Sequence, residues 1–301
     1  MKEKNVSVII PVYNQNSSLN ITLNFFNKQT YDNSLFEIIV VDDGSDDSAE
    51  KYIKERNSKF NYSLKFIRQQ NQGRANARNT GINNAQGEIL LFNDADRFPH
   101  HDFISKHMEH FIEDSNSTNK VVIGCSFDYF GSYNQPEKIL NLSMLEIHKM
   151  ARKPVFYSKI IQLYDEANYA ESNIRWISYL VGNSSIKKAN IEKVGGFDDY
   201  FSIWGAEHFD LAIRMVRQNY QFYLCEGAMN YHIPHKREAN FYKSNIEKSV
   251  ELLVQKYGDK RYYFLRDFLF GKISLQELEK QLTDSISRVL LEKDDLLNII
   301  H

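Results

Sequence analysis

The sequence predicts an α/β protein in which a parallel sheet is flanked by helices. Up to residue 96, short apolar runs alternate with segments of helical periodicity, and each run ends in polar or turn-forming residues. Alternation of this kind is typical of a parallel sheet with helices on both faces. Right-handed crossovers bring the carboxyl ends of such strands to one edge, where ligands bind in open α/β sheets. We therefore expect Tyr13, Asp43 and Asp94 to lie along one edge.

The first half of the chain supports this order element by element. The predicted strands are the apolar runs at residues 6–12, 36–41, 64–67 and 88–92. Helical stripes follow the first two runs, and Ser45 or Asp46 is suited to cap the second helix. A turn at 71–73 leads into a helix over 74–84, and Gly87 ends the segment before the fourth run.

The second half is less regular. We expect a helix at 102–113, strands at 121–127 and 220–225, and a strand over 177–186 that Gly182-Asn183 interrupts. A helix begins near Glu207, and residues 231–235 are predicted to form a loop. The sequence becomes helical from about residue 240, with a capping box at 274–277. We accordingly divide the chain into a domain at 1–239 and a C-terminal helical appendage at 240–301.

The last predicted helix is amphipathic, with leucines at 290, 291, 296 and 297 that need a partner. That partner is either the surface of the first domain or a second copy of the chain, so self-association through these helices stays open.

Composition narrows the function classes. The chain has 301 residues, 42% of them hydrophobic and 25% charged, which is ordinary for a globular protein. A net charge of −2 gives no field for nucleic acid, and two cysteines give neither a disulfide framework nor a thiolate metal site. The apolar run at residues 6–12 is too short for a signal peptide, and no apolar run approaches membrane-spanning length. The expected location is the cytoplasm, with peripheral membrane contact left open.

An acidic pair, Asp94 and Asp96, follows the fourth predicted strand. A hard divalent cation that carries a diphosphate typically uses one or two carboxylates together with the phosphates. The pair therefore fits a metal site, although turns favour aspartate for structural reasons too.

Three further residues at the predicted edge fit a nucleotide. The Asp43 carboxylate is suited to accept the imide N–H of a uracil, and Tyr13 to stack on a base. Arg78, on the helix that leads to the acidic strand, is suited to neutralise a phosphate or to hold the carboxylates. Each has a plain alternative, namely a turn aspartate, a packed tyrosine and a surface salt bridge.

Two histidines and a Glu-His pair in the second half also carry chemistry. His232 and His235 flank a proline, and imidazole is a common nitrogen ligand for divalent metals. Glu207 and His208 stand at a helix N-terminus, where the dipole favours a carboxylate and where a general base facing a cleft is well placed. The alternatives are an ordinary loop histidine and a first-turn acid.

Taken together, these motifs closely resemble family-two glycosyltransferases of the GT-A fold. The resemblance covers about residues 5–237 and rests on strand 6–14, on IVVDDGS at 39–45, on NQG at 71–73 with ARN at 77–79, and on DAD at 94–96. GGFD at 195–198, WGAE at 204–207 and YHIPH at 231–235 are similar to segments of galactosyltransferase-like and chondroitin-polymerase-like members.

The resemblance implies a Rossmann-like nucleotide-sugar domain and glycosyl transfer from a UDP-linked hexose or N-acetylhexosamine. On the donor side, Tyr13 and Asp43 would hold the base, Pro11 and Val12 would line the site, and Arg78 and Asp94 would contact the ribose and diphosphate. Asp94, Asp96 and His232 would hold Mn²⁺ or Mg²⁺. Trp204 would form a platform for the donor sugar or for a saccharide or peptide acceptor.

One departure concerns the catalytic base. The family usually has Glu-Asp, with the aspartate as base, where this chain has Glu207-His208 followed by Asp210. A histidine is able to act as a base at neutral pH, and Glu207, as a carboxylate, is slightly favoured over it. We expect inversion at the anomeric carbon. The alternative is a catalytically inactive nucleotide-sugar-binding subunit of a glycosylation complex. A nucleotidyltransferase is disfavoured because no glycine-rich phosphate loop follows the first strand.

Overall fold

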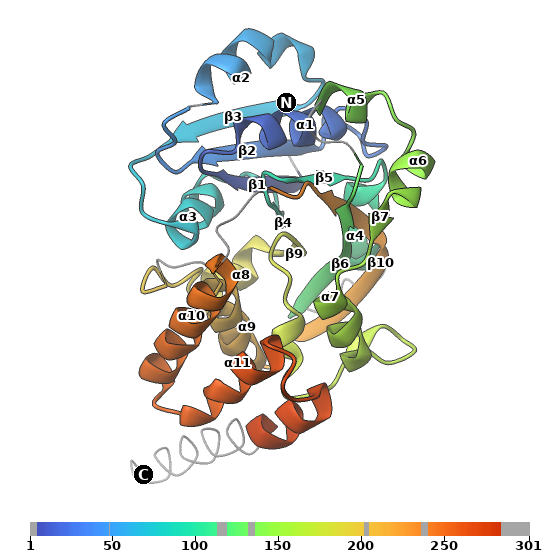
Figure 1. The fold of residues 1–301 in the computed structure, drawn as a ribbon. Coiled ribbons are helices and arrows are strands. Elements are labelled where there is room, and N and C mark those ends of the chain that lie inside the picture. The colour runs from blue at the N-terminus through green and yellow to red at the C-terminus, as the bar shows by residue number, and fades with distance from the viewer. Residues whose placement is uncertain are drawn as a thin grey trace.

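The computed structural model describes residues 5–47, 49–112, 119–131, 136–201, 205–235 and 240–283. One ten-stranded mixed sheet runs through the molecule, and its main path has the strand order β3-β2-β1-β4-β9-β6-β10-β5. Helices cover both faces, as Figure 1 shows. The order changes direction between β1 and β4, and ligands of open α/β sheets bind beside such a switch point.

The N-terminal half alternates strands and helices as the sequence predicts. Its elements are β1 (Val6–Val12), α1 (Asn16–Phe26), β2 (Phe36–Asp42), α2 (Glu50–Arg56), η1 (Asn57–Lys59), β3 (Ser63–Arg68), α3 (Arg74–Asn84), β4 (Ile89–Asn93), β5 (Arg97–Pro99) and α4 (Phe103–Ile112). β1 pairs in parallel with both β2 and β4, and β2 pairs in parallel with β3.

The second half adds strands of both directions. Its elements are β6 (Lys120–Tyr129), α5 (Pro136–Leu140), α6 (Met144–Lys149), β7 (Ala151–Arg152), α7 (Val155–Ile160), η2 (Ile161–Leu163), β8 (Tyr169–Ala170), η3 (Arg175–Ser178), β9 (Asn183–Lys187), α8 (Lys188–Val194), α9 (Glu207–Arg217), β10 (Gln221–His232), α10 (Phe241–Tyr257), η4 (Lys260–Tyr262) and α11 (Tyr263–Leu269). β9 lies antiparallel between β4 and β6, so the purely parallel sheet expected from the alternation is wrong here.

Alternate residues of the central strands supply two core layers. In β1, Ile9 packs with α3 and α9 on one face, whereas Val8 and Ile10 pack with α1, α2 and α4 on the other. β2 and β4 are divided in the same way. Strands that are buried on both faces read as continuous apolar runs, which explains why these strands were easy to identify from sequence.

Three local predictions were wrong. The strand expected over 177–186 is the 3₁₀ helix η3 followed by β9, which starts only at Asn183. β10 continues to His232 rather than ending at Cys225, because a bulge between Cys225 and Met229 absorbs the glycine-containing segment. Neither Ser45 nor Asp46 caps α2, which begins only at Glu50: the Ser45 hydroxyl accepts the Asn14 N–H (2.9 Å) and Asp46 accepts from the Asn14 side chain (3.3 Å), which ties the loop after β1 to the loop after β2.

The described part of the C-terminal region packs against the rest of the molecule. Val250, Leu253 and Val254 of α10 and Leu265 of α11 belong to the same core cluster as Trp176 and Phe209. A further helix starts at residue 275, and Ser274 accepts the N–H of Glu277 (3.1 Å). The boundary at 240 stays a prediction, and the four leucines expected to need a partner lie outside the described residues.

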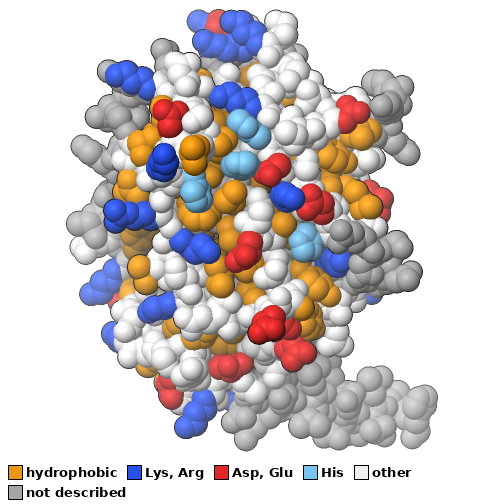
Figure 2. All heavy atoms as spheres, turned by 90° about the vertical axis from the view of Figure 1, so that its right-hand side faces the viewer, with side chains coloured by type: hydrophobic (Ala, Val, Ile, Leu, Met, Phe, Trp, Pro, Cys, Tyr) orange, Lys and Arg blue, Asp and Glu red, His pale blue; other side chains and the backbone are white. Residues whose placement is uncertain are grey.

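The surface has no dominant charge on the side shown in Figure 2. Lysine and arginine, aspartate and glutamate, and histidine side chains are interspersed there with hydrophobic ones. Among the helices that the structure describes, none is both long enough and apolar enough to span a membrane.

Candidate functional site

The acidic pair lies in a turn that buried amide side chains hold in place. Asn93, the last residue of β4, donates to the carbonyls of Asp94 (2.9 Å) and Arg97 (2.7 Å). Asn230 of β10 donates to the Asn93 side-chain oxygen (3.1 Å) and to the Gly182 carbonyl (2.8 Å). Both asparagines are fully buried, so their hydrogen bonds fix the turn against its neighbouring strands.

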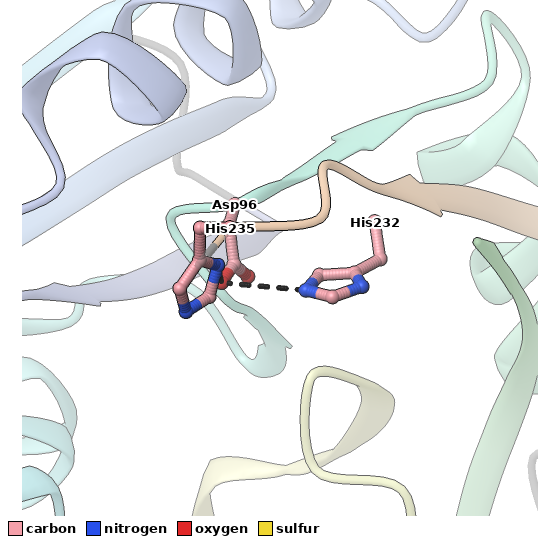
Figure 3. A group of neighbouring side chains, drawn as sticks. All are labelled: Asp96, His232 and His235. Atoms are coloured by element: carbon pink, nitrogen blue, oxygen red, sulfur yellow. Dashed lines mark ion pairs between the residues drawn. The ribbon is translucent and has the colours of Figure 1, made fainter. Parts of the chain in front are cut away.

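Asp96 lies beside two histidines, as Figure 3 shows. His232 is the last residue of β10, and His235 lies in the loop that follows it. The Asp96 Oδ2 atom is 3.7 Å from His232 Nε2 and 3.5 Å from His235 Nδ1. One ligand atom from each of Asp96, His232 and His235 lies within 4.8 Å of the other two. The other ring nitrogen of His232, Nδ1, is 2.9 Å from Oδ1 of Asp128 in β6.

This group has the donor set and the supporting contacts of a divalent metal site. Metal-binding histidines usually hold their second ring nitrogen against a carboxylate, as His232 does with Asp128. One carboxylate with two imidazoles suits Mn²⁺ better than Mg²⁺, which prefers oxygen ligands.

Neighbouring charges and contacts shift the pKa values of Asp96 and His232 in opposite directions. Burial opposes ionisation of Asp96, but the nearby His232 side chain and the charges of Arg97 and Arg74 outweigh it and lower the pKa of Asp96. Burial also opposes protonation of His232, but the contacts to Asp128 and Asp96 prevail and raise its pKa. A cation bound through His232 would need a neutral imidazole, so metal binding competes with protonation of His232.

Asp94 is not part of this group in the structure. Its Oδ1 atom accepts from Arg78 Nη2 (3.1 Å), and its Oδ2 atom accepts from Arg97 Nε (3.4 Å). A Cβ atom on Gly182 would come within 2.3 Å of Asp94 Oδ2, so only glycine fits beside this carboxylate without a rearrangement. Arg97 in turn donates to the Tyr157 hydroxyl (3.2 Å) from α7.

Arg78 links Asp94 to the first residue of α9. The side chain of Arg78 is only 1% exposed, and its Nη1 donates to Glu207 Oε1 (2.9 Å). The Nε of Arg78 is buried without a hydrogen-bond partner among the described residues. Glu207 is 3% exposed, and its Oε2 accepts the Gly205 N–H (3.0 Å). Both oxygens of Glu207 are therefore engaged.

Glu207 and His208 differ in their readiness to take a proton. Burial would raise the pKa of Glu207, but the charges of His208, Arg78 and Arg74 outweigh it and lower that pKa. Burial is the largest influence on His208 and lowers its pKa, which leaves a neutral imidazole at pH 7. The His208 side chain keeps 19% exposure, and its Nδ1 lies 4.0 Å from Glu207 Oε1.

The predicted nucleotide-side residues lie at the carboxyl ends of β1 and β2. Pro11 and Val12 are buried in β1, and Tyr13 is 48% exposed directly after it. Asp43 Oδ1 accepts from Gln69 Nε2 (2.8 Å) and Gln72 N (3.0 Å), and Oδ2 accepts from Gly73 N (2.9 Å). Trp204 lies outside the described residues.

Sequence reasoning missed part of this arrangement. Arg97, Asp128, Asn93 and Asn230 were not singled out, and His235 was noted beside His232 but not placed in the metal group. The HxxH spacing was the one available signal for His235. Asp128 and Asn230 become recognisable only when β6 and β10 are paired, because each belongs to a strand far from the acidic pair in sequence.

Comparisons with known proteins identify the family and the fold of the chain. A family model described as glycosyl transferase family 2 matches residues 7–170, and one described as the N-terminal domain of galactosyltransferase matches residues 162–236. The uncharacterized glycosyltransferase YfnE of Bacillus subtilis is 27% identical over 287 residues, which cover 85% of this chain and 71% of YfnE. Chondroitin synthase of Escherichia coli is 27% identical over 266 residues, which cover 83% of this chain but 38% of that protein.

A solved structure of GalNAc-T7 with UDP, GalNAc and Mn²⁺ superposes with a TM-score of 0.62 at 18% identity and covers 94% of this chain and 54% of that one. This likeness confirms the predicted GT-A fold. The family models confirm the resemblance read from the strand-end motifs, and the first of them spans more than half of the sequence. The chain therefore belongs to the glycosyltransferases of family 2.

Proposed function

We propose that the protein transfers a sugar from a UDP-linked hexose or N-acetylhexosamine to a saccharide or peptide acceptor, with a divalent cation and inversion at the anomeric carbon. The observation that carries the proposal is the group of Asp96, His232 and His235 together with the buried Arg78–Glu207 ion pair. His208 lies next to that ion pair, with its Nδ1 atom 4.0 Å from Glu207 Oε1. UDP and Mn²⁺ are bound in the structure of GalNAc-T7, and chondroitin synthase is among the relatives, which supports the substrate class.

On the donor side, Asp96, His232 and His235 would hold Mn²⁺. Such an ion supplies positive charge that stabilises the leaving nucleoside diphosphate. Asp94 and Arg78 would contact the ribose and diphosphate, and among the described residues Arg78 uses only two of its five N–H donors, on Asp94 and Glu207. We keep Asp94 as a further candidate ligand because a carboxylate has about four acceptor positions, and two are used here.

The uracil ring would lie between Tyr13 and the backbone of Pro11 and Val12. The carboxylate of Asp43 already accepts three hydrogen bonds, which fix the turn at Gln72 and Gly73. About one acceptor position remains, enough for a single imide N–H. Trp204 stays the predicted platform for the sugar or the acceptor.

For the chemical step, we favour His208 over Glu207 as general base. The acceptor hydroxyl would give its proton to the neutral imidazole as its oxygen bonds to the anomeric carbon and the bond to the diphosphate breaks. Glu207 has both oxygens engaged and a lowered pKa, which suits a residue that holds Arg78 and favours the protonated form of His208.

The direct test is release of UDP from a panel of UDP-sugars, measured with and without Mn²⁺. We expect metal-dependent release for at least one donor, accelerated by a cognate acceptor. A protein that binds a UDP-sugar, shown by thermal stabilisation, but never releases UDP with any acceptor would instead be the inactive binding subunit.

A further inference from the structure

Helix α10 contacts the chain on both sides of the catalytic pair. A Cβ atom on Gly205, just before Glu207, would lie 3.5 Å from Ser249 Oγ of α10, and Ser249 is 4% exposed. Asp210, one turn after Glu207, accepts from Lys256 Nζ (2.5 Å) and Tyr257 OH (2.6 Å) of the same helix. Ser249 and Lys256 are seven residues apart and so lie on one face of α10.

Lys256 contacts two aspartates: Asp198 lies before the catalytic segment, which we define as residues 205–211, and Asp210 lies near its end. Its Nζ also contacts Asp198 Oδ2 (2.6 Å), in the turn that precedes α9. Asp198 and Asp210 stand on opposite sides of Glu207 and His208 in the chain. A single cation on α10 therefore fixes both ends of the stretch that carries the proposed base.

Asp210 itself is suited to hold this arrangement and not to exchange protons with a substrate. Its side chain is fully buried, and Arg214 Nε donates to its Oδ2 (2.9 Å) in addition to the two donors from α10. The other two nitrogens of the Arg214 guanidinium donate to the carbonyls of Val194 and Gly196 (both 2.7 Å). A carboxylate with three donors and no exposed surface is anchored, and the notion of Asp210 as an alternative base is disfavoured.

Both family models end before α10, at residues 170 and 236. We propose that α10 is a clamp on the catalytic segment of this enzyme and that Lys256 is a positioning residue for His208 and Glu207. The inference rests on the proposed function, because it assigns the clamp a role in the transfer step. A base displaced by about 1 Å costs up to about 100-fold in turnover, so the clamp should control kcat and not donor affinity.

The test compares Lys256→Met, Lys256→Arg and Tyr257→Phe in the full chain, with Lys248→Met as control. Lys248 is an exposed lysine on the same helix. We expect Lys256→Met to lower kcat about 10- to 100-fold while UDP affinity in Mn²⁺ stays within about twofold. Lys256→Arg should recover most of the turnover, because it restores the charge. Tyr257→Phe should have a smaller effect, and Lys248→Met none.

Hydrogen exchange supplies a readout that does not depend on transfer. Amides of residues 205–211 should exchange faster in Lys256→Met than in the wild type and in Lys248→Met. Unchanged exchange and unchanged kcat in Lys256→Met would overturn the clamp, and so would parallel loss of kcat, UDP affinity and thermal stability that Lys256→Arg fails to rescue. If these amides exchange faster in Lys256→Met but the wild type transfers no sugar, the clamp stands as a structural feature and the proposed function is refuted.

Discussion

The metal side and the base side of the site are held by different kinds of contact. Around Asp96, the supports are neutral amides and a histidine–carboxylate pair on strands of the central sheet, within the segments that the family models cover. Around Glu207 and His208, the supports are ion pairs that come from α3 and from α10, and α10 lies beyond those models.

This difference predicts how each side of the site fails when one of its residues is replaced. Buried amide networks on strands are fixed by sheet register, so a substitution there disturbs several strands at once. Buried ion pairs between helices depend on every partner being present, because a lone buried charge is costly. We expect the metal side to fail by loss of cation or donor, and the base side to fail by loss of turnover or of stability.

The largest effect on donor binding should follow removal of the metal. Chelation with EDTA, or Asp96→Asn, should weaken UDP binding by more than about 100-fold, because the phosphates lose the cation's charge. Calorimetry of UDP binding with Mn²⁺ and with EDTA measures this. His101→Ala, a histidine outside the group, serves as control. Equal UDP affinity with and without metal would remove Asp96, His232 and His235 from the donor site.

Loss of the base should leave binding intact. His208→Ala should reduce turnover by about 10²–10⁴-fold at nearly unchanged UDP affinity, since a general base acts in the transition state and not on the bound donor. Steady-state kinetics with UDP titrations on the same preparation separate the two quantities. Near-normal turnover in His208→Ala would return the role to Glu207.

Arg78 should matter most to stability. Arg78→Met leaves the carboxylates of Asp94 and Glu207 without their shared buried cation, and breaking buried pairs typically costs about 3–5 kcal/mol. Chemical denaturation measures the free energy of unfolding. Lys51→Met is the control, because the Lys51 side chain is 87% exposed and its loss should be nearly neutral. A loss in Arg78→Met no larger than in that control would show that the two carboxylates find other partners.

The smallest expected effect concerns the residue behind His232. Asp128→Asn should weaken Mn²⁺ affinity by about 10- to 100-fold, the usual cost of losing a carboxylate that orients a metal-binding histidine. Titration of Mn²⁺ into the UDP-bound protein reports this change. Unaltered Mn²⁺ affinity would mean that His232 is oriented without Asp128, or is no ligand.

The sequence predicted the parts of the protein that are local. Continuous apolar runs identified β1, β2 and β4, and the residues directly after them were placed at the sheet edge. The sequence-based prediction failed where the pairing of strands decides the structure. The direction of β9 and the extension of β10 to His232 depend on neighbouring strands, and a bulge hides that extension from any alternation pattern. Neither the contact of Arg78 with Glu207 nor the contact of Lys256 with Asp210 has a local signal, because the paired residues lie 129 and 46 positions apart in the chain.

The most direct test of the account is the pH dependence of kcat for the wild type and for His208→Asp. A base must be deprotonated, and the His208 pKa lies below its ordinary value of about 6.5, so wild-type turnover should be flat down to about that pH and fall at lower pH. The ordinary pKa of aspartate, about 3.9, is lower than that of histidine, so His208→Asp should retain activity and shift the acid limb to lower pH. An acid limb that stays in place in an active His208→Asp variant would contradict the assignment of His208 as the base.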